Sequence, residues 1–376
     1  MEKLAEKSSL VGIIVPTMNR PDFVIRQLNY YASLDSPHTL YYADSSGPES
    51  AKKIKDEIEK LKNKLNAVYV ASPAGDIVKS LVQLLSLVKE KYAVFVSDDD
   101  YWIPDALSEC VEFLEKNSDY EIATGKSIMF KTENNEVYGK IKEIDDYAKY
   151  SVENDTASER LLAYLGEKSS TCITAVLRTD HFLKYNQDSL EIKDFSMRSE
   201  LLISCLMLIA GKYKVIDKLG YVMQIHDTNS AHSAGDTFDW IIDNENWHSS
   251  YNLVRSKAVA ALTAKDNISQ EKAEQVFKQS MWFYLGTNLR GHYDRSISRG
   301  TMNTINPAKQ AKKSLRTKIA TRLPLLKKVY RQFIVPWLKR NQLQYEVTRP
   351  GSKYYKDLQN IVDSLAGKNK THGKIV

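Results

Sequence analysis

The chain has 376 residues, which is long enough to bury a substantial core and to carry one large domain with an extension. Charged residues make up 27% and apolar residues 43%, a globular composition that excludes an intrinsically disordered chain. The three cysteines, Cys110, Cys172 and Cys205, lie too far apart in sequence for a metal-binding spacing. We expect them to be buried thiols in a reducing compartment.

The sequence shows no targeting or membrane-spanning signal. Residues 1–10 are polar and charged and lack the apolar stretch of a signal peptide. The longest mostly apolar run without charges, 201–210, is about half the length needed to cross a bilayer. We therefore expect a cytoplasmic protein without a transmembrane helix.

The net charge of +6 is unevenly distributed along the chain. Between Arg295 and Tyr345 there are 13 Lys or Arg residues and no Asp or Glu, so the remainder, with 40 basic and 47 acidic residues, is net acidic. A segment with this charge favours an anionic surface. No recognised nucleic-acid-binding module accompanies it, so nucleic acid is not an expected partner.

Residues 10–98 alternate short apolar runs with amphipathic segments. This alternation is typical of a parallel α/β sheet with flanking helices. Strands are predicted at 10–16, at 40–43, at 67–70 and in the run ending at Asp98; helices are predicted in the segment containing Phe23, Ile25 and Leu28, at 50–65 and at 77–88.

The pattern is looser after the fourth predicted strand. Residues 131–159 are polar and predict an insertion or a long loop. A helical region is expected from Phe238, with a linker at 296–307. The predicted organisation is a catalytic domain at 1–237, a helical extension at 238–300 and a basic C-terminal region at 301–376. Between the polar stretch and the helical region we predict strand 170–177, helix 200–209 and strand 212–216.

Polar side chains follow the predicted strands at the edge where ligands bind in parallel α/β sheets. The most informative are Asp98, Asp99 and Asp100, which end the buried run Val94–Val96. Three adjacent carboxylates repel one another and resist desolvation. They are explained by a divalent cation such as Mg²⁺ or Mn²⁺, which takes oxygen ligands and shares them with substrate phosphates. The alternative is a solvated acidic turn before the helix that begins near Pro104.

Four motifs follow one another in the first hundred residues: the run 11–20, Asp44, Gly75, and 97–100 with Trp102 and Pro104. In this order they resemble the family 2 glycosyltransferases of the GT-A fold, over residues 10–235. The resemblance implies a Rossmann-like, mixed but mainly parallel sheet, a nucleotide-sugar donor that is usually UDP-linked, a divalent metal (Mn²⁺ or Mg²⁺), and inversion at the anomeric carbon.

The resemblance also implies roles for individual residues. Asp98 would bind the ribose and the metal-bound diphosphate, Asp99 and Asp100 would be metal ligands, and His226, in a loop that closes over the donor, would bind the metal or the diphosphate; His232 in the same loop is a weaker candidate. The nucleotide-sugar site would comprise Pro16, Thr17, Asn19, Arg20, Asp44, Gly75, Lys79 and Asp98.

The catalytic base of the family is a carboxylate about eleven residues before a glycine that precedes a strand. Counting back from Gly211 reaches Glu200, where the family usually has Asp. An inverting transfer needs this group to take the proton of the acceptor hydroxyl. The alternatives are Asp194 as the base, or Glu200 as an acid at a helix N-terminus.

The acceptor and the surroundings of the enzyme are less specified by the sequence. Trp240 and Trp247 could stack on an acceptor sugar or pack a helix.

An apolar stripe runs from Leu315 to Trp337 and is broken at Pro324 and Pro336. It gives residues 309–340 the character of amphipathic cationic helices, which would lie on an anionic membrane or pack internally. We expect a peripheral enzyme on the cytoplasmic membrane face that acts on a glycan or lipid-linked acceptor. A sugar-nucleotide pyrophosphorylase and a non-catalytic sugar-binding subunit are the alternatives.

Overall fold

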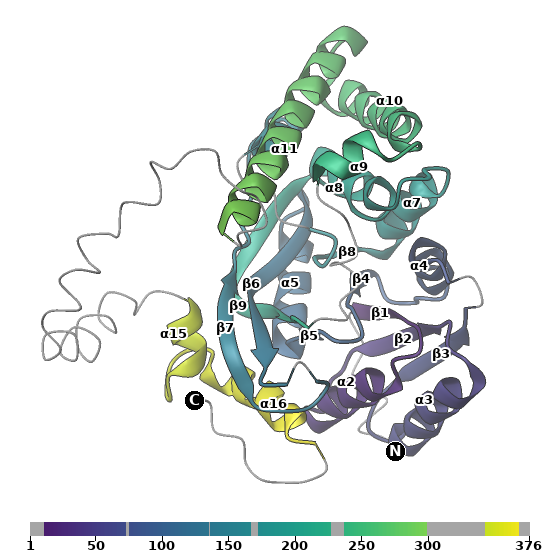
Figure 1. The fold of residues 1–376 in the computed structure, drawn as a ribbon, viewed down its shortest axis with the longest axis vertical. Coiled ribbons are helices and arrows are strands. Elements are labelled where there is room, and N and C mark those ends of the chain that lie inside the picture. Colours follow the sequence, from purple (N-terminus) through teal and green to yellow (C-terminus); the bar gives the residue numbers. More distant parts are fainter. Residues whose placement is uncertain are drawn as a thin grey trace, which may run out of the picture.

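The computed structural model describes residues 11–72, 75–134, 136–166, 172–226, 237–298 and 343–367. A nine-stranded mixed sheet organises them, with strand order β3-β2-β1-β4-β8-β6-β9-β5 and β7 paired to β6 (Figure 1). Consecutive residues of the first strand point to opposite faces of the sheet: Ile13 belongs to one buried cluster and Ile14 to another. The sheet is therefore covered on both faces, as an α/β fold requires.

The first half of the sheet is parallel and confirms the predicted alternation. Pro21 and Pro48 occupy the first turns of the two helices that follow β1 and β2, where their missing N–H groups cost no hydrogen bond. The parallel strands are β1 (Val11–Thr17), β2 (Thr39–Asp44), β3 (Ala67–Ala71) and β4 (Tyr92–Phe95), and their helices are α2 (Pro21–Ser33), α3 (Pro48–Leu61) and α4 (Ile77–Leu85).

The second half of the sheet is mixed. Its two longest strands, β6 and β9, run parallel and approach closely at Gly125 and Gly220, where a Cβ on Gly125 would lie 2.7 Å from the Gly220 backbone. The other strands of this half are short or antiparallel. The elements are β5 (Tyr101–Trp102), α5 (Pro104–Lys116), β6 (Tyr120–Thr132), β7 (Ile141–Tyr147), β8 (Val176–Arg178) and β9 (Lys212–Gln224).

Two expectations about this half need correction. The polar stretch 131–159 is not an unstructured insertion, because it contains β7, which pairs antiparallel with β6 through Ile144 and Phe130. Its polar residues are the exposed side of that strand, whereas Ile141 and Ile144 are buried. The strand predicted at 212–216 extends as β9 to Gln224. This extension brings Ile225 and His226 to the edge of the sheet that carries the acidic cluster.

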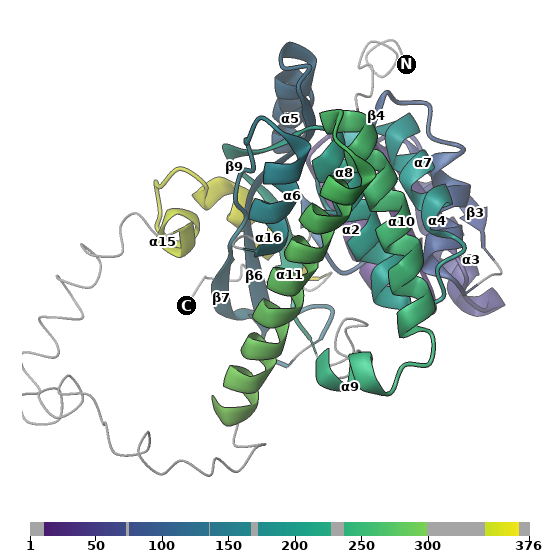
Figure 2. The same cartoon turned by 90° about the horizontal axis from the view of Figure 1, so that it is seen from above.

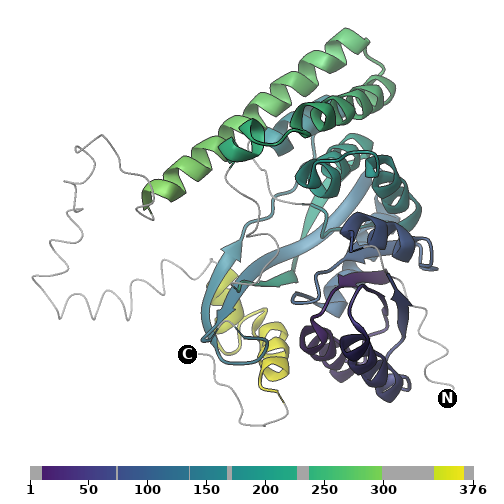
Figure 3. The ribbon, with the colours of Figure 1, turned by 45° about the vertical axis from the view of Figure 1, so that its right-hand side comes forward.

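Helices cover the far end of the sheet, as Figures 2 and 3 show. The nearly all-apolar α8 is buried, and α10 packs on it while the long α11 packs on α6 and α10. This confirms the helical region expected from Phe238. The elements are α6 (Ala157–Gly166), α7 (Thr179–Ser189), the π-helix η1 (Met197–Leu201), α8 (Leu202–Ala210), α9 (Thr237–Ile242), α10 (Trp247–Asp266) and α11 (Gln270–Ser298).

The C-terminal helices return to the sheet: α15 (Leu343–Thr348) packs against β6 and β7, and α16 (Tyr355–Leu365) packs against α2 (Figure 1). Tyr354, Leu358 and Ile361 are fully buried in the same cluster as β1. The predicted division at residue 301 is therefore wrong for these residues, which complete the core of the first domain. Most of the predicted linker, the stripe at 309–340 and His232 lie outside the described residues.

Two smaller observations bear on the expectations from composition. The three cysteines are buried and form no disulfide. In the part of the chain that the structure describes, no helix has the length and apolarity needed to cross a bilayer.

Candidate functional site

Asp98 and Asp99 lie beyond the end of β4 and face Arg20, which directly precedes α2. One guanidinium nitrogen of Arg20 is 2.7 Å from Asp98 Oδ1 and the other is 2.8 Å from Asp99 Oδ2. Both carboxylates are buried, while the Arg20 side chain is 26% exposed. The parallel register of β1 and β4 brings these residues together, since both strands end at the same edge of the sheet.

His226 joins this group from the residues after β9. Its Nε2 is 2.8 Å from Asp99 Oδ2 and 3.0 Å from Arg20 Nη2. The imidazole stacks on Phe23 at 5.1 Å, and the Arg20 guanidinium lies 4.3 Å from the centre of the same ring. Phe23, which the sequence suggested only as a core residue, therefore packs against both the Arg20 guanidinium and the His226 imidazole.

The loops after β1 and β2 are tied together next to this group. Thr17 donates a hydrogen bond of 2.6 Å from Oγ1 to Asp98 Oδ2. Asn19 has a positive φ of 56°, and its side-chain oxygen accepts from the Gly47 backbone. Asp44, at the end of β2, is buried and accepts from Tyr69 Oη and the Ser46 backbone. The half-buried Pro16 belongs to β1 and pairs with Ala43.

Asp100 does not join the carboxylates that face Arg20. One of its oxygens accepts from the Gln224 backbone at 2.8 Å, and the other accepts from the Tyr221 hydroxyl. These contacts tie the loop after β4 to β9, so the geometry gives Asp100 a structural position.

Arg26 is a second buried cation that sequence reasoning missed. It donates to the Gln224 side chain at 2.6 Å and to the Asp99 carbonyl at 2.7 Å. The neighbouring Gln27 donates to the carbonyls of Ser97 and Asp100, each at 2.9 Å. The available signal was a charged residue three positions after Phe23, on an otherwise apolar face of the predicted helix.

The three neighbouring carboxyls differ in their proton affinity. Burial and the Asp99 charge raise the pKa of Asp98 to about 6, although Arg20 opposes the shift. Burial acts on Asp99 in the same direction, but the His226 hydrogen bond and Arg20 outweigh it and lower the pKa of Asp99. Burial and the Asp99 charge raise the pKa of Asp100. The negative charge is therefore concentrated on Asp99.

The donor atoms around Asp99 are compatible with a divalent cation. Asp99 Oδ2 and His226 Nε2 lie 2.8 Å apart and converge with Arg20 on one side of the cluster. Hard cations such as Mg²⁺ commonly bind through one or two side chains and take their other ligands from substrate phosphates and water. Within the described ranges no three His, Cys, Asp or Glu side chains form a complete metal site. The fit therefore depends on oxygens that a diphosphate would supply.

The loop after β3 contributes less to this cluster than predicted. Gly75 has a positive φ of 57° and precedes Asp76, which caps α4 by accepting from the backbone N–H groups of Val78 and Lys79. The Lys79 side chain is 63% exposed, and its ammonium is 4.0 Å from Asp76. Arg198 also pairs with Asp76, at 3.0 Å, and this contact joins the loop to η1.

The two candidate bases, Asp194 and Glu200, have different surroundings. Asp194 is buried, and its carboxylate accepts from the Met197 backbone, Trp240 Nε1 and Asn244 Nδ2 at 2.6–2.7 Å. It caps the helical turn that leads into η1, which is the role considered for Glu200 from the sequence. A carboxylate that already accepts three hydrogen bonds is poorly available to a substrate proton.

Glu200 projects from η1 and is exposed to solvent on one side. Among the described residues its carboxylate has no hydrogen-bond or ion-pair partner. Burial by the surrounding protein raises the pKa of Glu200, and the Lys149 ammonium opposes this shift. Availability and raised proton affinity are the properties that a general base needs. The π-helical turn is itself a feature often found at functional sites.

The two tryptophans considered as acceptor contacts serve packing. Trp240 donates to Asp194, and Trp247 stacks on Tyr251 with ring centres 5.2 Å apart and planes 6° apart. Both are part of the helical layer formed by α9 and α10.

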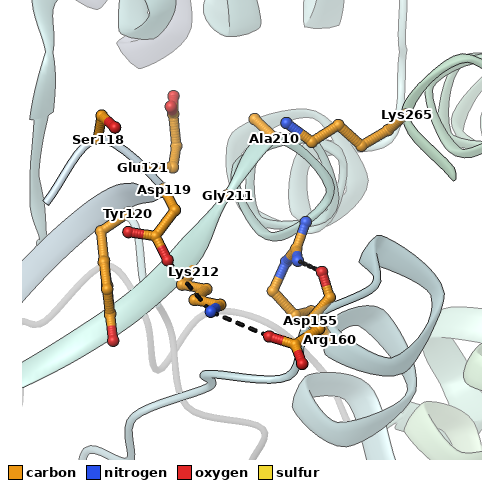
Figure 4. Close-up of a pocket in the computed structure, with 10 residues that line it drawn as sticks. All are labelled: Ser118, Asp119, Tyr120, Glu121, Asp155, Arg160, Ala210, Gly211, Lys212 and Lys265. Atoms are coloured by element: carbon orange, nitrogen blue, oxygen red, sulfur yellow. Dashed lines mark hydrogen bonds and ion pairs between the residues drawn. The ribbon is translucent and has the colours of Figure 1, made fainter.

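A second recess, of about 260 Å³, lies at the opposite edge of the sheet, where β6 and β9 begin (Figure 4). One of its cations is already paired, since Lys212 lies 3.1 Å from both Asp119 and Asp155. Arg160 donates to the carbonyls of Leu208 and Ile209 at the end of α8. We interpret this recess as a structural junction.

Comparison with known proteins finds similarity to glycosyltransferases. Residues 12–186 match Glycosyl transferase family 2. Over 121 residues the chain is 26% identical to TuaG of Bacillus subtilis (strain 168), named as a teichuronic acid biosynthesis glycosyltransferase; the match covers 32% of this chain and 48% of TuaG. The chain thus spans about half the length of that relative.

Solved structures of TarS from S. aureus are also similar to the chain. A TarS 1-349 structure in complex with UDP-GlcNAc has 18% identity and a TM-score of 0.45, covering 80% of this chain and 77% of that one. A longer TarS structure has 15% identity and a TM-score of 0.43, covering 73% of this chain and 54% of that one.

Proposed function

We propose that the chain transfers a sugar from a UDP-sugar donor to a hydroxyl of a glycan or lipid-linked acceptor, in surface polysaccharide biosynthesis. The chain belongs to glycosyl transferase family 2 through residues 12–186. The observation that carries the proposal is the meeting of Arg20, Asp98, Asp99 and His226 at the carboxyl edge of the sheet, with Glu200 available on a separate helix. The first group would contact a diphosphate through Arg20 and through a divalent cation held by its carboxylate and imidazole, and Glu200 would accept a proton.

The donor would bind across the ends of β1, β2 and β4. Asp44 lies at the end of β2, next to Tyr69, where it can accept from a nucleobase. Asp98 would accept from ribose hydroxyls, and Arg20 would turn its guanidinium from the carboxylates toward the diphosphate. Arginine suits this exchange because its planar fork binds carboxylate and phosphate oxygens equally well.

The acceptor would be activated by Glu200. As the acceptor oxygen bonds to the anomeric carbon, its proton moves to Glu200, and the bond from that carbon to the diphosphate oxygen breaks with its electron pair leaving on the nucleoside diphosphate. A single displacement of this kind inverts the anomeric centre. The raised pKa of Glu200, caused by burial, strengthens it as a base.

A divalent cation, Mn²⁺ or Mg²⁺, fits the donor atoms of Asp99 and His226. When bound it would stabilise the negative charge on the departing diphosphate. Arg26, which donates to the Asp99 carbonyl, provides a further buried positive charge beside the same place.

The alternatives lack comparable support. A pyrophosphorylase needs a loop that cradles a triphosphate with successive backbone N–H groups, and residues 18–20, which join β1 to α2, contain no glycine. A non-catalytic sugar-binding subunit has no need for an available carboxylate of raised pKa such as Glu200.

Release of nucleoside diphosphate tests the proposal. The purified chain would be incubated with Mn²⁺ and each of UDP-glucose, UDP-N-acetylglucosamine, UDP-glucuronic acid and GDP-mannose, with and without a short glycan acceptor. We expect release from one UDP-sugar, increased by the acceptor and absent in Asp99→Ala. Formation of a nucleotide sugar from sugar phosphate and nucleoside triphosphate would instead identify a pyrophosphorylase.

We also propose that the basic segment at 309–340 binds an anionic membrane surface and keeps the enzyme near a lipid-linked acceptor. The support is its charge, since each Lys or Arg near such a surface contributes about 1 kcal/mol. Replacing Lys312, Lys313, Lys327 and Lys328 by Gln in the full chain should reduce flotation with phosphatidylglycerol vesicles. Equal flotation of both proteins at 0.1 M salt would contradict the proposal.

A further inference from the structure

Arg26 of α2 places a charged side chain in the interior of the protein, beside the loop after β4. Only 2% of this residue is exposed. Its guanidinium carbon lies 5.0 Å from the centre of the Phe23 ring and 5.0 Å from the centre of the Tyr101 ring. Removing a guanidinium from water is costly, so specific contacts must offset the burial of this group. Those contacts indicate what Arg26 does.

The guanidinium of Arg26 joins three segments that are far apart in sequence. One terminal nitrogen donates to the Asp99 carbonyl at 2.7 Å, in the loop after β4. The other donates to the side-chain oxygen of Gln224 at 2.6 Å, at the end of β9, and to the carbonyl of Val137, between β6 and β7. These acceptors are uncharged oxygens. Because the guanidinium is a rigid, planar fork, it fixes the spacing between the segments that it joins.

Two of the three segments carry the proposed metal ligands. Asp99 uses its carbonyl for Arg26, which leaves its carboxylate for Arg20 and for His226 Nε2, each at 2.8 Å. Gln224 lies two residues before His226 and continues the backbone that presents the imidazole. Arg26 therefore bridges the two chain segments from which Asp99 and His226 approach each other.

The turn between β6 and β7 supports this bridge from a third direction. In addition to its contact with Arg26, it accepts a hydrogen bond of 2.9 Å from the Gln224 side chain through the Glu136 carbonyl. The Gly139 backbone N–H donates to the Leu365 carbonyl at 3.0 Å, which ties the same turn to α16. The position of the guanidinium is thus determined by several fixed parts of the fold.

We propose that Arg26 is a positioning residue for the metal site: by joining the loop after β4 to the end of β9, it holds the Asp99 carboxylate and the His226 imidazole where both can bind one divalent cation. The inference rests on the proposed function of Asp99 and His226. Groups that orient metal ligands without touching the ion commonly account for about 10–100-fold in metal affinity.

Binding of Mn²⁺ in the presence of UDP tests the inference without any transfer reaction. Free Mn²⁺ would be measured by electron paramagnetic resonance while the ion is titrated into the full chain with UDP. The proteins compared would be wild type, Arg26→Met, Arg26→Lys, Gln224→Met and the double variant Arg26→Met with Gln224→Met. Arg160→Met is the matched control, because Arg160 is 3% exposed and donates to the carbonyls of Leu208 and Ile209 at the opposite edge of the sheet.

We expect Arg26→Met to weaken Mn²⁺ binding by about tenfold or more, and Gln224→Met to weaken it by a smaller factor. The double variant should bind no more weakly than Arg26→Met, because both substitutions break the same bridge. Arg26→Lys should restore little, since an ammonium keeps the charge but lacks the planar fork. Arg160→Met should lower the melting temperature and leave Mn²⁺ affinity unchanged.

Three results would overturn the inference: wild-type Mn²⁺ affinity in Arg26→Met, full restoration by Arg26→Lys, or losses that add in the double variant. If Arg26→Met does not fold, Gln224→Met decides, and wild-type affinity in that variant overturns the inference.

Asp99→Ala separates this inference from the proposed function. If Asp99→Ala binds Mn²⁺ with UDP as tightly as wild type does, the proposed metal site is wrong, and the role of Arg26 is wrong with it. If Asp99→Ala loses the ion while Arg26→Met keeps it, only the positioning role is wrong.

Discussion

The carboxylates at the end of β4 and the carboxylate on η1 are held in opposite ways. Asp99 is buried and contacted by Arg20 and His226 within 3 Å, which lowers its pKa. Glu200 is exposed on one side, and burial by its other neighbours raises its pKa. The first arrangement makes a permanent negative charge that can exchange cationic partners with a diphosphate. The second makes a carboxylate that can take a proton.

The same difference separates Asp194 from Glu200 in the segment around η1. Asp194, only six residues before Glu200, resembles Asp99 in being surrounded by donors, although its donors are neutral. Sequence position therefore does not separate a base from a cap in this segment. The number of hydrogen bonds that each carboxylate already accepts does.

The largest effect is expected at the end of β4. Asp99→Ala removes the carboxylate shared by Arg20 and His226, so both side chains lose their common partner and the proposed metal and diphosphate site loses its central ligand. UDP release should fall by about 10³-fold, the scale of a lost electrostatic anchor. Asp100→Asn, in the position tied to Tyr221 and Gln224, should cost less than tenfold. Equal losses in the two variants would restore Asp100 to the metal site.

The next effect concerns the base. Glu200→Gln keeps the size of the side chain but cannot accept a proton, so kcat should fall by about 10²-fold or more while UDP binding is kept. Asp194→Asn should instead lower the melting temperature, because its new NH2 group would face either the Met197 N–H or the two donors Trp240 and Asn244. Measuring kcat and the melting temperature of both variants shows which of the two carboxylates is the base. A larger kcat loss in Asp194→Asn would show that the base is Asp194.

Local patterns predicted the first half of the sheet because each strand, turn and helix there is adjacent in sequence. Val11–Thr17, Pro21 and the run before Asp98 each reveal their structure within a few residues. Asp98 and Arg20 each follow a predicted strand, and strands of a parallel sheet end at one edge, so their proximity could also be predicted.

Partners from distant segments could not be predicted in this way. Tyr221 reaches Asp100 only because β9 pairs with β6 and β5 across long separations in sequence. The polar composition of 131–159 suggested a loop, because one face of β7 is exposed. The burial of Ile361 was hidden by the basic segment that precedes it, whose charge suggested a separate region.

A smaller, structural effect tests how far the site at the end of β4 depends on the C-terminal helices. Ile361 of α16 is fully buried in the cluster shared with β1, and α16 packs on α2, which carries Arg26. Ile361→Ala should reduce the free energy of unfolding by about 2–4 kcal/mol through lost burial and a cavity. The exposed Lys356→Ala on the same helix is the control. Equal melting temperatures of the two variants would show that α16 is not part of the core.

The smallest expected effect concerns Asp98, which we expect to contribute to donor binding while lowering the stability of the fold. Burial and Asp99 raise the pKa of Asp98 to about 6 from an ordinary 3.8, so the folded chain binds this proton more tightly than the unfolded chain. Asp98 therefore costs stability as the pH rises from about 4 to 6, and the full cost remains above 6. Asp98→Asn resembles the protonated acid: its carbonyl can still accept from Arg20, and the Thr17 hydroxyl can accept from its amide. We expect the variant to melt about 2–4 °C higher than wild type at pH 7.5 and equally at pH 4, while UDP binding weakens. Lower melting at pH 7.5 would mean that the pairing of Asp98 with Arg20 stabilises the fold more than its burial beside Asp99 costs.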